Sequence, residues 1–246
     1  MAKRIHSDPL TFNRLEKAVR EHEVSGRTPS AAFLIWFLKT IYRLDLVEAQ
    51  DAVCDKKFDI GIDALVASDN QQEIVLFQAK RAEKLPATLG DTDLKKFVGT
   101  LAHFRTEQAV TRLVQTCKND DLRRLLVASR AAEKIGKGYK LRLIFVSNVT
   151  ANEDAGTYIK YAADAGDTID LWDLARLGPV LNQLATEWFV EKRITLNAVP
   201  DRMFLDGPKK DPRLIFAAVP ATELVRLPGI EDTRVFAQNV RLWLGN

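Results

Sequence analysis

The sequence predicts an α/β protein in which a mixed central sheet is flanked by helices. Two segments, residues 58–66 and 73–80, alternate apolar and polar side chains with period two, as the strands of an antiparallel hairpin do. Two short continuous apolar runs, residues 141–146 and 168–172, are typical of buried strands. Segments with helical periodicity precede, separate and follow these strands, and this alternation predicts a sheet with helices packed on it.

Two helices are expected before the hairpin. Residues 11–23 carry apolar side chains at helical spacing among polar ones, which predicts a surface helix. Thr28 followed by Pro29 is a helix start signal, and the apolar run from residue 31 to about residue 47 predicts a buried helix. The apolar stripe of this helix is formed by Phe37, Ile41 and Leu44. Because the next position on the stripe is Glu48, we expect the helix to carry a carboxylate along its buried face.

The hairpin places polar side chains where a core is expected. With its turn centred between Asn70 and Gln71, Asp63 lies opposite Gln78, and Gly61 lies opposite Lys80. All four residues then share one face of the hairpin. Buried charge is costly unless it is paired or bound to a metal, so a carboxylate, a carboxamide and an ammonium group at this place indicate a functional site.

The remaining elements follow the hairpin in order. Helices are expected over residues 91–118 and 122–135, then a strand, a helix over 154–165, a second strand, and a helix from Asp173 to about residue 190. From residue 194 prolines interrupt short apolar segments, with a strand expected over 213–217, a short helix over 221–227 and an apolar segment over 235–244. The sequence therefore predicts a main domain over residues 1–192 and a small C-terminal unit over residues 193–246.

Composition limits the kind of site that the chain can build. The 246 residues include no apolar stretch approaching the roughly 20 residues that span a bilayer, so no membrane partner is expected. Only two cysteines and three histidines are present, which argues against a disulfide framework or a zinc site and favours a reducing cytoplasm. A metal would be held by oxygen atoms, which favours Mg²⁺ or Mn²⁺.

Positive charge is concentrated after the hairpin. Residues 80–142 contain fifteen Lys/Arg and seven Asp/Glu, so this stretch carries +8 while the whole chain carries +3. A phosphate-binding surface and a solvated helical face explain this excess equally well. Arg81, Lys95 and Lys96 are the candidate nucleic-acid contacts.

The polar residues of the hairpin resemble the motifs of the PD-(D/E)XK nuclease superfamily, in its Mrr-like branch with Gln in place of the second acid. The matching segments are Gly61-Ile62-Asp63-Ala64 and Gln78-Ala79-Lys80. The resemblance implies a restriction-endonuclease-like core in which Glu48 and Asp63 hold the metal. It also implies that the Gln78 side chain and the Ala79 carbonyl complete the metal shell, and that Lys80 serves the attacking water.

A narrower resemblance links the chain to the abortive-infection phage-resistance proteins called AIPR. It rests on the hairpin motifs, on residues 145–148 and on the segment from Phe236 through Asn239-Val240-Arg241 to Gly245. It implies an endonuclease of prokaryotic anti-phage defence. Since members of that family continue beyond this segment, we expect the chain to be the amino-terminal portion of a longer protein, and a homodimer is left open.

The sequence thus predicts a divalent-metal-dependent nuclease that hydrolyses phosphodiester bonds, with DNA favoured over RNA. Asp45 and Asp51 are substitutes for Glu48 as the second metal ligand, and Asp59 is interpreted as structural. The alternative function is a nucleic-acid-binding module with a nuclease-like fold and no catalysis. A third alternative is a regulator that binds proteins and uses the polar cluster as a structural ion pair.

Overall fold

The chain divides into two compact units, Met1–Thr186 and Glu187–Asn246. The computed structural model describes residues 7–23, 26–54 and 60–185, together with short stretches between residues 197 and 224. The predicted domain boundary after residue 192 lies outside the described residues.

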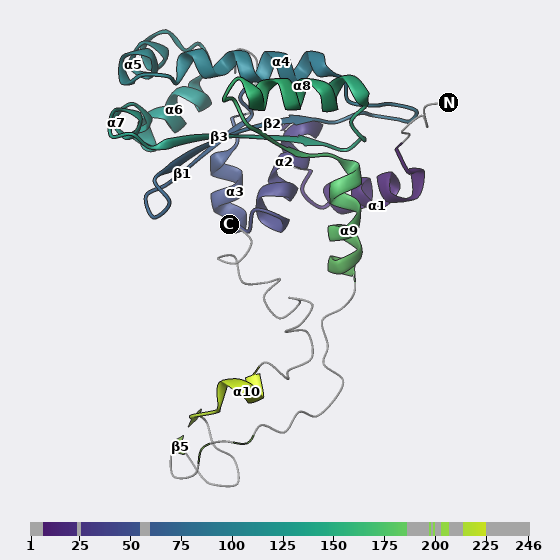
Figure 1. Cartoon of the computed structure of the whole chain (residues 1–246), viewed down its shortest axis with the longest axis vertical. Coiled ribbons are helices and arrows are strands. Elements are labelled where there is room, and N and C mark those ends of the chain that lie inside the picture. The colour runs from purple at the N-terminus through teal and green to yellow at the C-terminus, as the bar shows by residue number, and fades with distance from the viewer. Residues whose placement is uncertain are drawn as a thin grey trace. The chain divides into compact units, whose positions relative to one another are not determined.

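A four-stranded mixed sheet forms the centre of the first unit (Figure 1). Its strands lie in the order β1 (Ala64–Ser68), β2 (Glu73–Lys80), β3 (Lys140–Ser147) and β4 (Ile169–Trp172). The first two strands are antiparallel, whereas β2, β3 and β4 are parallel neighbours. Ala64 pairs with Phe77 and Leu65 with Leu76, so the predicted hairpin register is confirmed.

Helices cover both faces of this sheet (Figure 1). One face carries α1 (Pro9–Arg20), α2 (Pro29–Thr40), α3 (Leu46–Ala52) and α9 (Leu174–Ala185), and the other carries α4 (Asp91–Gly99) and α8 (Glu153–Asp164). A short η1 (Thr100–His103) leads to α5 (Glu107–Thr116), α6 (Asp120–Ala128) and α7 (Ala131–Gly136), which pack on one another beside β1. The aromatic contacts Phe37–Phe77 and Phe97–Phe145 hold one helix to each face.

The long helices predicted from the sequence are divided into shorter ones. The predicted start of this buried helix at Thr28-Pro29 is confirmed, but its extension to about residue 47 is wrong, because α2 ends at Thr40 and Arg43 adopts a left-handed conformation with φ 65°. Asp45 then caps a new helix, α3, through a reciprocal capping box with Glu48. The predicted helix over 91–118 is divided at the cap Thr106, and that over 122–135 is divided at the left-handed Arg130, whereas the predicted gap between them is confirmed by the cap Asn119. At Asp45, Thr106 and Asn119 a side-chain cap competes successfully with helix continuation, whereas Arg130 makes no side-chain cap hydrogen bond.

The described part of the second unit is a small hairpin and one helical turn. Strand β5 (Met203–Asp206) pairs antiparallel with β6 (Leu214–Ala217), and α10 (Ala221–Leu224) follows. The strand expected over residues 213–217 is therefore present, whereas the apolar segment 235–244 lies outside the described residues.

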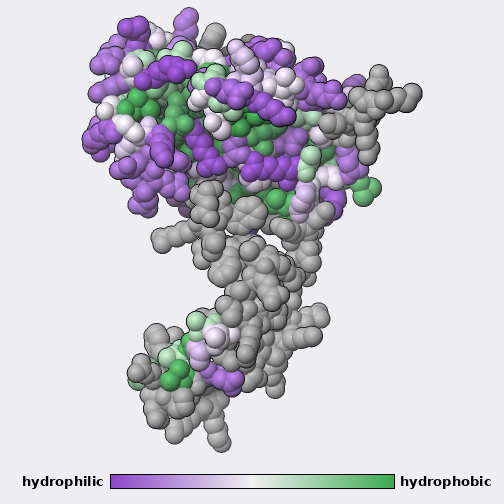
Figure 2. All heavy atoms as spheres, in the orientation of Figure 1, coloured by the Kyte–Doolittle hydropathy of each residue, from purple (hydrophilic) through white to green (hydrophobic). Residues whose placement is uncertain are grey.

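Figure 2 shows mostly hydrophilic side chains on one face of the first unit, with apolar ones between them. Among the described residues, no helix combines the length and the apolar character needed to cross a bilayer.

At the β4 edge of the sheet, Asp170 joins two arginines and a tryptophan. Its carboxylate accepts hydrogen bonds from Arg142 Nη2 at 2.7 Å, from Arg176 Nη1, and from Trp172 Nε1 at 3.3 Å. The Arg176 guanidinium also lies 3.7 Å from the centre of the Trp172 ring. Burial alone would raise the pKa of Asp170, but the hydrogen bonds from Arg176 and Arg142 outweigh it and hold that pKa below its usual value.

We expect Asp170→Asn to lower the free energy of unfolding by about 2 kcal/mol at pH 7, because two guanidinium groups lose their carboxylate. Since the pKa is lower in the folded state than in the unfolded state, the carboxylate stabilises the protein above the unfolded pKa, and this contribution is lost as the pH falls below about 4. Urea unfolding of both proteins at pH 7 and at stepwise lower pH measures the difference. A difference that is independent of pH would contradict this explanation.

Candidate functional site

A turn with strained backbone conformation at residues 60–61 precedes Asp63, which lies just before β1. Ile60 and Gly61 both have positive φ, 54° and 84°. Glycine adopts this conformation freely, but a β-branched residue does so only when the surrounding structure holds it there, and such residues cluster at functional sites. The chain therefore turns at residues 60–61, and β1 begins at Ala64, later than the predicted strand at residue 58. Asp59 lies outside the described residues.

Asp63 is bonded to β2 through both its backbone and its side chain. Its N–H donates to the Phe77 carbonyl at 2.8 Å, and its carbonyl accepts from the Cys54 N–H at 2.9 Å. Oδ2 of its carboxylate accepts from the Ala79 N–H at 2.7 Å. The carboxylate thus takes the place of a backbone acceptor at the end of the ladder, which fixes it beside Gln78 and Ala79.

The side-chain amide oxygen of Gln78 is buried in the fold. Its Oε1 has no hydrogen-bond partner among the residues that the structure describes. Its Nε2 lies at Gly61, where an added Cβ would come within 3.6 Å of Nε2 and 3.3 Å of Thr100 Cγ2. Gly61 was expected opposite Lys80, but the turn brings it to Gln78 instead. Because an unpaired buried acceptor is costly, its retention beside a carboxylate points to a ligand.

Lys80 follows Gln78 by two residues on β2 and therefore shares its face. Its ammonium lies 3.4 Å from Oδ2 of Asp93, in the first turn of α4. The two side chains are 57% and 28% exposed, respectively. Asp93 is not among the site residues predicted from the sequence. The available signal was an acidic residue in the first turn of the helix that follows the strand of Lys80.

Glu48 has a different place from the one expected. It is exposed, and its carboxylate accepts from the Asp45 N–H at 3.2 Å while Asp45 Oδ1 accepts from the Glu48 N–H at 2.8 Å. The prediction of a buried helix face at Glu48 is therefore wrong. Helix α3 covers the face of the sheet opposite α4 (Figure 1), and the substitutes Asp45 and Asp51 are exposed on the same segment.

The oxygen atoms gathered at the end of the hairpin suit a hard cation. Asp63 offers a carboxylate, Gln78 an unpaired amide oxygen, and Ala79, between Gln78 and Lys80, is held by the Asp63 carboxylate. Oxygen donors of this kind are the ligands preferred by Mg²⁺ and Mn²⁺. Within the described residues, however, no group of three or more Asp, Glu, His or Cys side chains is positioned to hold a metal. The donor set there fits a cation held by one carboxylate and supplemented by neutral oxygens.

Arg81 was expected to contact nucleic acid, but its side chain binds other residues of the same chain. Its Nη2 lies 2.6 Å from Glu16 Oε2, its Nη1 lies 3.3 Å from Glu23 Oε1 and donates to the Pro29 carbonyl, and its side chain is only 12% exposed. These partners neutralise the guanidinium and occupy its donors. The structure thus directs Arg81 towards α1 and not towards solvent.

The same network anchors the chain just beyond Lys80. Asn148 is fully buried, and its Nδ2 donates to Glu16 Oε1 at 2.8 Å and to the Ala82 carbonyl at 2.9 Å. Its Oδ1 accepts from the Ala82 N–H at 2.7 Å. The backbone around Lys80 is therefore fixed on both sides, by Asp63 at Ala79 and by Asn148 at Ala82.

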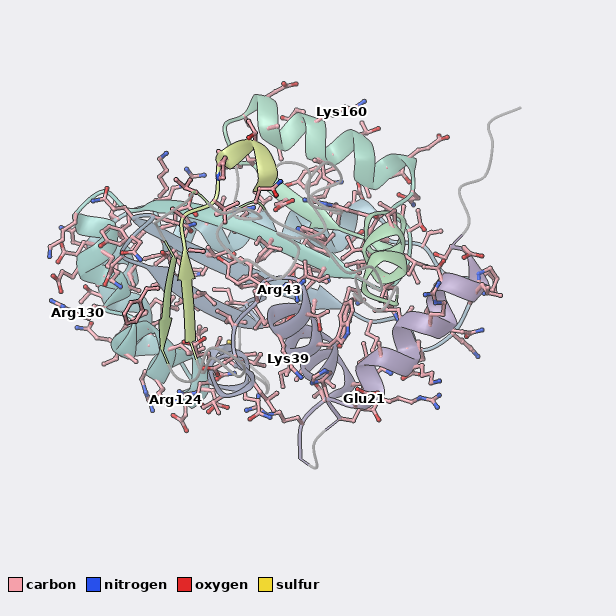
Figure 3. All side chains as sticks on the ribbon, turned by 90° about the horizontal axis from the view of Figure 1, so that it is seen from below. Glu21, Lys39, Arg43, Arg124, Arg130 and Lys160 are labelled. Atoms are coloured by element: carbon pink, nitrogen blue, oxygen red, sulfur yellow. The ribbon has the colours of Figure 1, made fainter. Side chains whose placement is uncertain are left out.

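Many of the basic residues after the hairpin have acidic partners. Lys95 pairs with Asp91 at 2.6 Å and lies over the Tyr158 ring, while Lys96 is exposed on the same helix. Further ion pairs join Arg105 to Asp167, Arg123 to Asp120, Arg130 to Glu133 and Lys134 to Asp69. Arg124 and Arg130 extend outward at the α6–α7 end of the first unit (Figure 3). Many basic residues of this stretch are thus engaged in surface ion pairs, as those of a solvated helical face would be.

We expect Gln78→Met to raise the free energy of unfolding by about 1 kcal/mol in the presence of a chelator, because the substitution removes a buried unpaired oxygen and keeps the side-chain length. Urea unfolding measures the change. Gln115→Met, at an exposed position of α5, is the matched control and should change stability by less than about 0.5 kcal/mol. A loss of stability in Gln78→Met would mean that the amide oxygen is satisfied in the folded protein.

Comparison of the chain with protein-family models, with curated proteins and with solved structures finds no match. The functional interpretation of this site therefore rests on its own residues and their geometry.

Proposed function

We propose that this chain is a divalent-metal-dependent nuclease that hydrolyses phosphodiester bonds, with DNA favoured over RNA as the substrate. The observation that carries the proposal is the buried Oε1 of Gln78, which has no hydrogen-bond partner among the described residues, on the strand whose Ala79 N–H binds the Asp63 carboxylate. Lys80, two residues further along β2, adds a positive charge on the face that Gln78 shares.

The residues divide the chemistry among them. When bound, a divalent cation supplies charge neutralisation and lowers the pKa of a coordinated water. Asp63 and Gln78 would hold the cation with their side-chain oxygens, together with the Ala79 carbonyl. Lys80 would donate hydrogen bonds to a phosphate oxygen or to the attacking water, where negative charge develops in the transition state. The Ala79 N–H keeps the Asp63 carboxylate in one orientation throughout.

Within this proposal, we assign a restriction-endonuclease-like core to the first unit and a role in anti-phage defence to the protein. The core is supported by the two motifs of the hairpin, by the antiparallel β1–β2 pair that carries them and by the parallel strands β3 and β4 that follow. The defence role is proposed from the narrower resemblance alone.

One observation favours a second function, a nucleic-acid-binding module without catalysis. Glu48 uses its carboxylate in the capping box of α3, and within the described residues no group of three metal-binding side chains forms around Asp63. A cation held by a single carboxylate is bound more weakly than one held by two. The two functions differ in whether added Mg²⁺ or Mn²⁺ produces cleavage.

We expect the wild-type chain to cleave DNA in Mg²⁺ or Mn²⁺ and to be inactive in chelator. Asp63→Asn and Lys80→Ala should each lower the rate at least about 100-fold, as the loss of a residue that stabilises developing charge does. Asparagine is the preferred replacement because it keeps an oxygen for the Ala79 N–H, whereas alanine removes that hydrogen bond. Labelled duplex DNA, single-stranded DNA and RNA, separated on denaturing gels, measure the cleavage.

Matched controls for this assay are Asp164→Asn and Lys160→Ala, two exposed residues of α8. Lys160 points outward from that helix (Figure 3). Both controls should cleave at the wild-type rate. Full activity in Asp63→Asn would overturn the assignment of the site.

If the chain binds duplex DNA through phosphate contacts, its affinity should fall with salt at a log–log slope of about −0.9 per contact. Fluorescence anisotropy of labelled duplex in chelator, over a series of KCl concentrations, measures the slope without cleavage. Salt-dependent binding together with no cleavage in any metal would favour the non-catalytic module. A slope near zero would count against both functions.

A further inference from the structure

The ion pair between Lys80 and Asp93 links the lysine that we propose to act in catalysis to α4, a helix outside the two hairpin motifs. The ammonium lies 3.4 Å from Asp93 Oδ2, and the lysine side chain is 57% exposed. A lysine this exposed has four rotatable bonds and loses considerable rotamer entropy when it is held in one place. A fixed carboxylate nearby is a direct way of restricting that freedom.

Helix α4 is rigid enough to provide such a carboxylate. Asp93 and Phe97 are four residues apart, so they lie on the same face of the helix. Phe97 is fully buried, and its ring centre lies 5.9 Å from that of Phe145 on β3. Phe145 in turn is the register partner of Gln78. The contact that seats α4 on the sheet therefore lies beside the candidate site and directs Asp93 towards Lys80.

The same helix carries an ion pair that serves as an internal comparison. Asp91 and Lys95 are 2.6 Å apart, with side-chain exposures of 31% and 56%, which match those of Asp93 and Lys80. Lys95 lies 5.6 Å from the Tyr158 ring of α8. The Asp91–Lys95 pair therefore resembles the Asp93–Lys80 pair in side-chain exposure, but it faces α8 and not the hairpin.

We propose that Asp93 is a positioning residue for Lys80, holding its ammonium on the face shared by Asp63 and Gln78 so that it meets a non-bridging oxygen of the phosphodiester. The proposal rests on the nuclease function proposed above. Asp93 touches neither substrate nor cation in this arrangement, and its effect on the reaction passes through Lys80.

The kinetic test is a double-mutant cycle. Asp93→Asn should lower kcat about tenfold with little change in KM, because a misplaced catalytic group loses rate more than ground-state binding. In a Lys80→Ala background the same substitution should change kcat less than about twofold, since residues acting through one another are not additive. Asp93→Glu, which keeps the carboxylate, should recover part of the lost rate. Asp91→Asn is the matched control and should leave kcat unchanged.

A second readout does not depend on cleavage. Nuclear magnetic resonance relaxation of ¹⁵N-labelled lysine ammonium groups reports how strongly each Nζ is held. Asp93→Asn should lower the order parameter of the Lys80 ammonium and leave that of Lys95 unchanged, and Asp91→Asn should do the converse.

The outcomes separate this inference from the proposed function. A wild-type chain that cleaves no nucleic acid in any metal overturns the nuclease function, and the catalytic purpose of the pair with it. An active chain whose kcat and Lys80 order parameter are unaffected by Asp93→Asn overturns the inference alone. If Asp93→Asn lowers kcat by the same factor in the wild-type chain and in the Lys80→Ala background, the inference is also overturned, because Asp93 would then act independently of Lys80.

Discussion

The hydrogen bond from the Ala79 N–H to the Asp63 carboxylate is the interaction on which the candidate site depends. It takes the place of a ladder bond at the end of the β1–β2 pair, so at Ala79 the strand that carries Gln78 and Lys80 is bonded to an acidic side chain in addition to its backbone pairing with β1. The carboxylate is therefore both a structural acceptor and a candidate ligand. Because it is bonded through one oxygen to a rigid strand, its orientation is set before any cation or substrate arrives, which is the preorganisation that catalytic groups require.

Near this bond, two features that destabilise the folded state accompany a hydrogen-bond network that fixes the backbone. Ile60 holds a left-handed conformation, and Gln78 retains a buried oxygen that has no partner among the described residues; each destabilises the folded state. Immediately beyond Lys80, the buried network of Arg81, Glu16 and Asn148 fixes the chain with hydrogen bonds at both Nδ2 and Oδ1 of Asn148. Proteins that keep strained or unsatisfied groups compensate for them elsewhere, and such local conflicts concentrate at functional sites. The neighbouring network is that compensation here.

The local features of the fold were predictable because they depend on short-range pattern. Period-two alternation and the turn around Asn70 gave the correct hairpin register, and the apolar runs gave strands β3 and β4 close to their observed bounds. The breaks at Asp45 and Thr106 were missed because side-chain caps outweigh an apolar periodicity that continues across them, whereas the break at Asn119 falls in the predicted gap between residues 118 and 122. Element type followed from periodicity, whereas helix ends depended on single hydrogen bonds.

The sequence by itself determined that Asp63, Gln78 and Lys80 occupy one end of a hairpin, since strand register follows from alternation and turn position alone. Only the tertiary structure decided what each charged side chain meets. It placed Arg81 against Glu16, 65 residues away in the chain, and Lys80 against Asp93 on another element, whereas the capping box of Asp45 and Glu48 is a local contact. The physical reason is that a charge selects its partner by distance in space, and that distance is fixed by how helices such as α1 and α4 pack on the sheet.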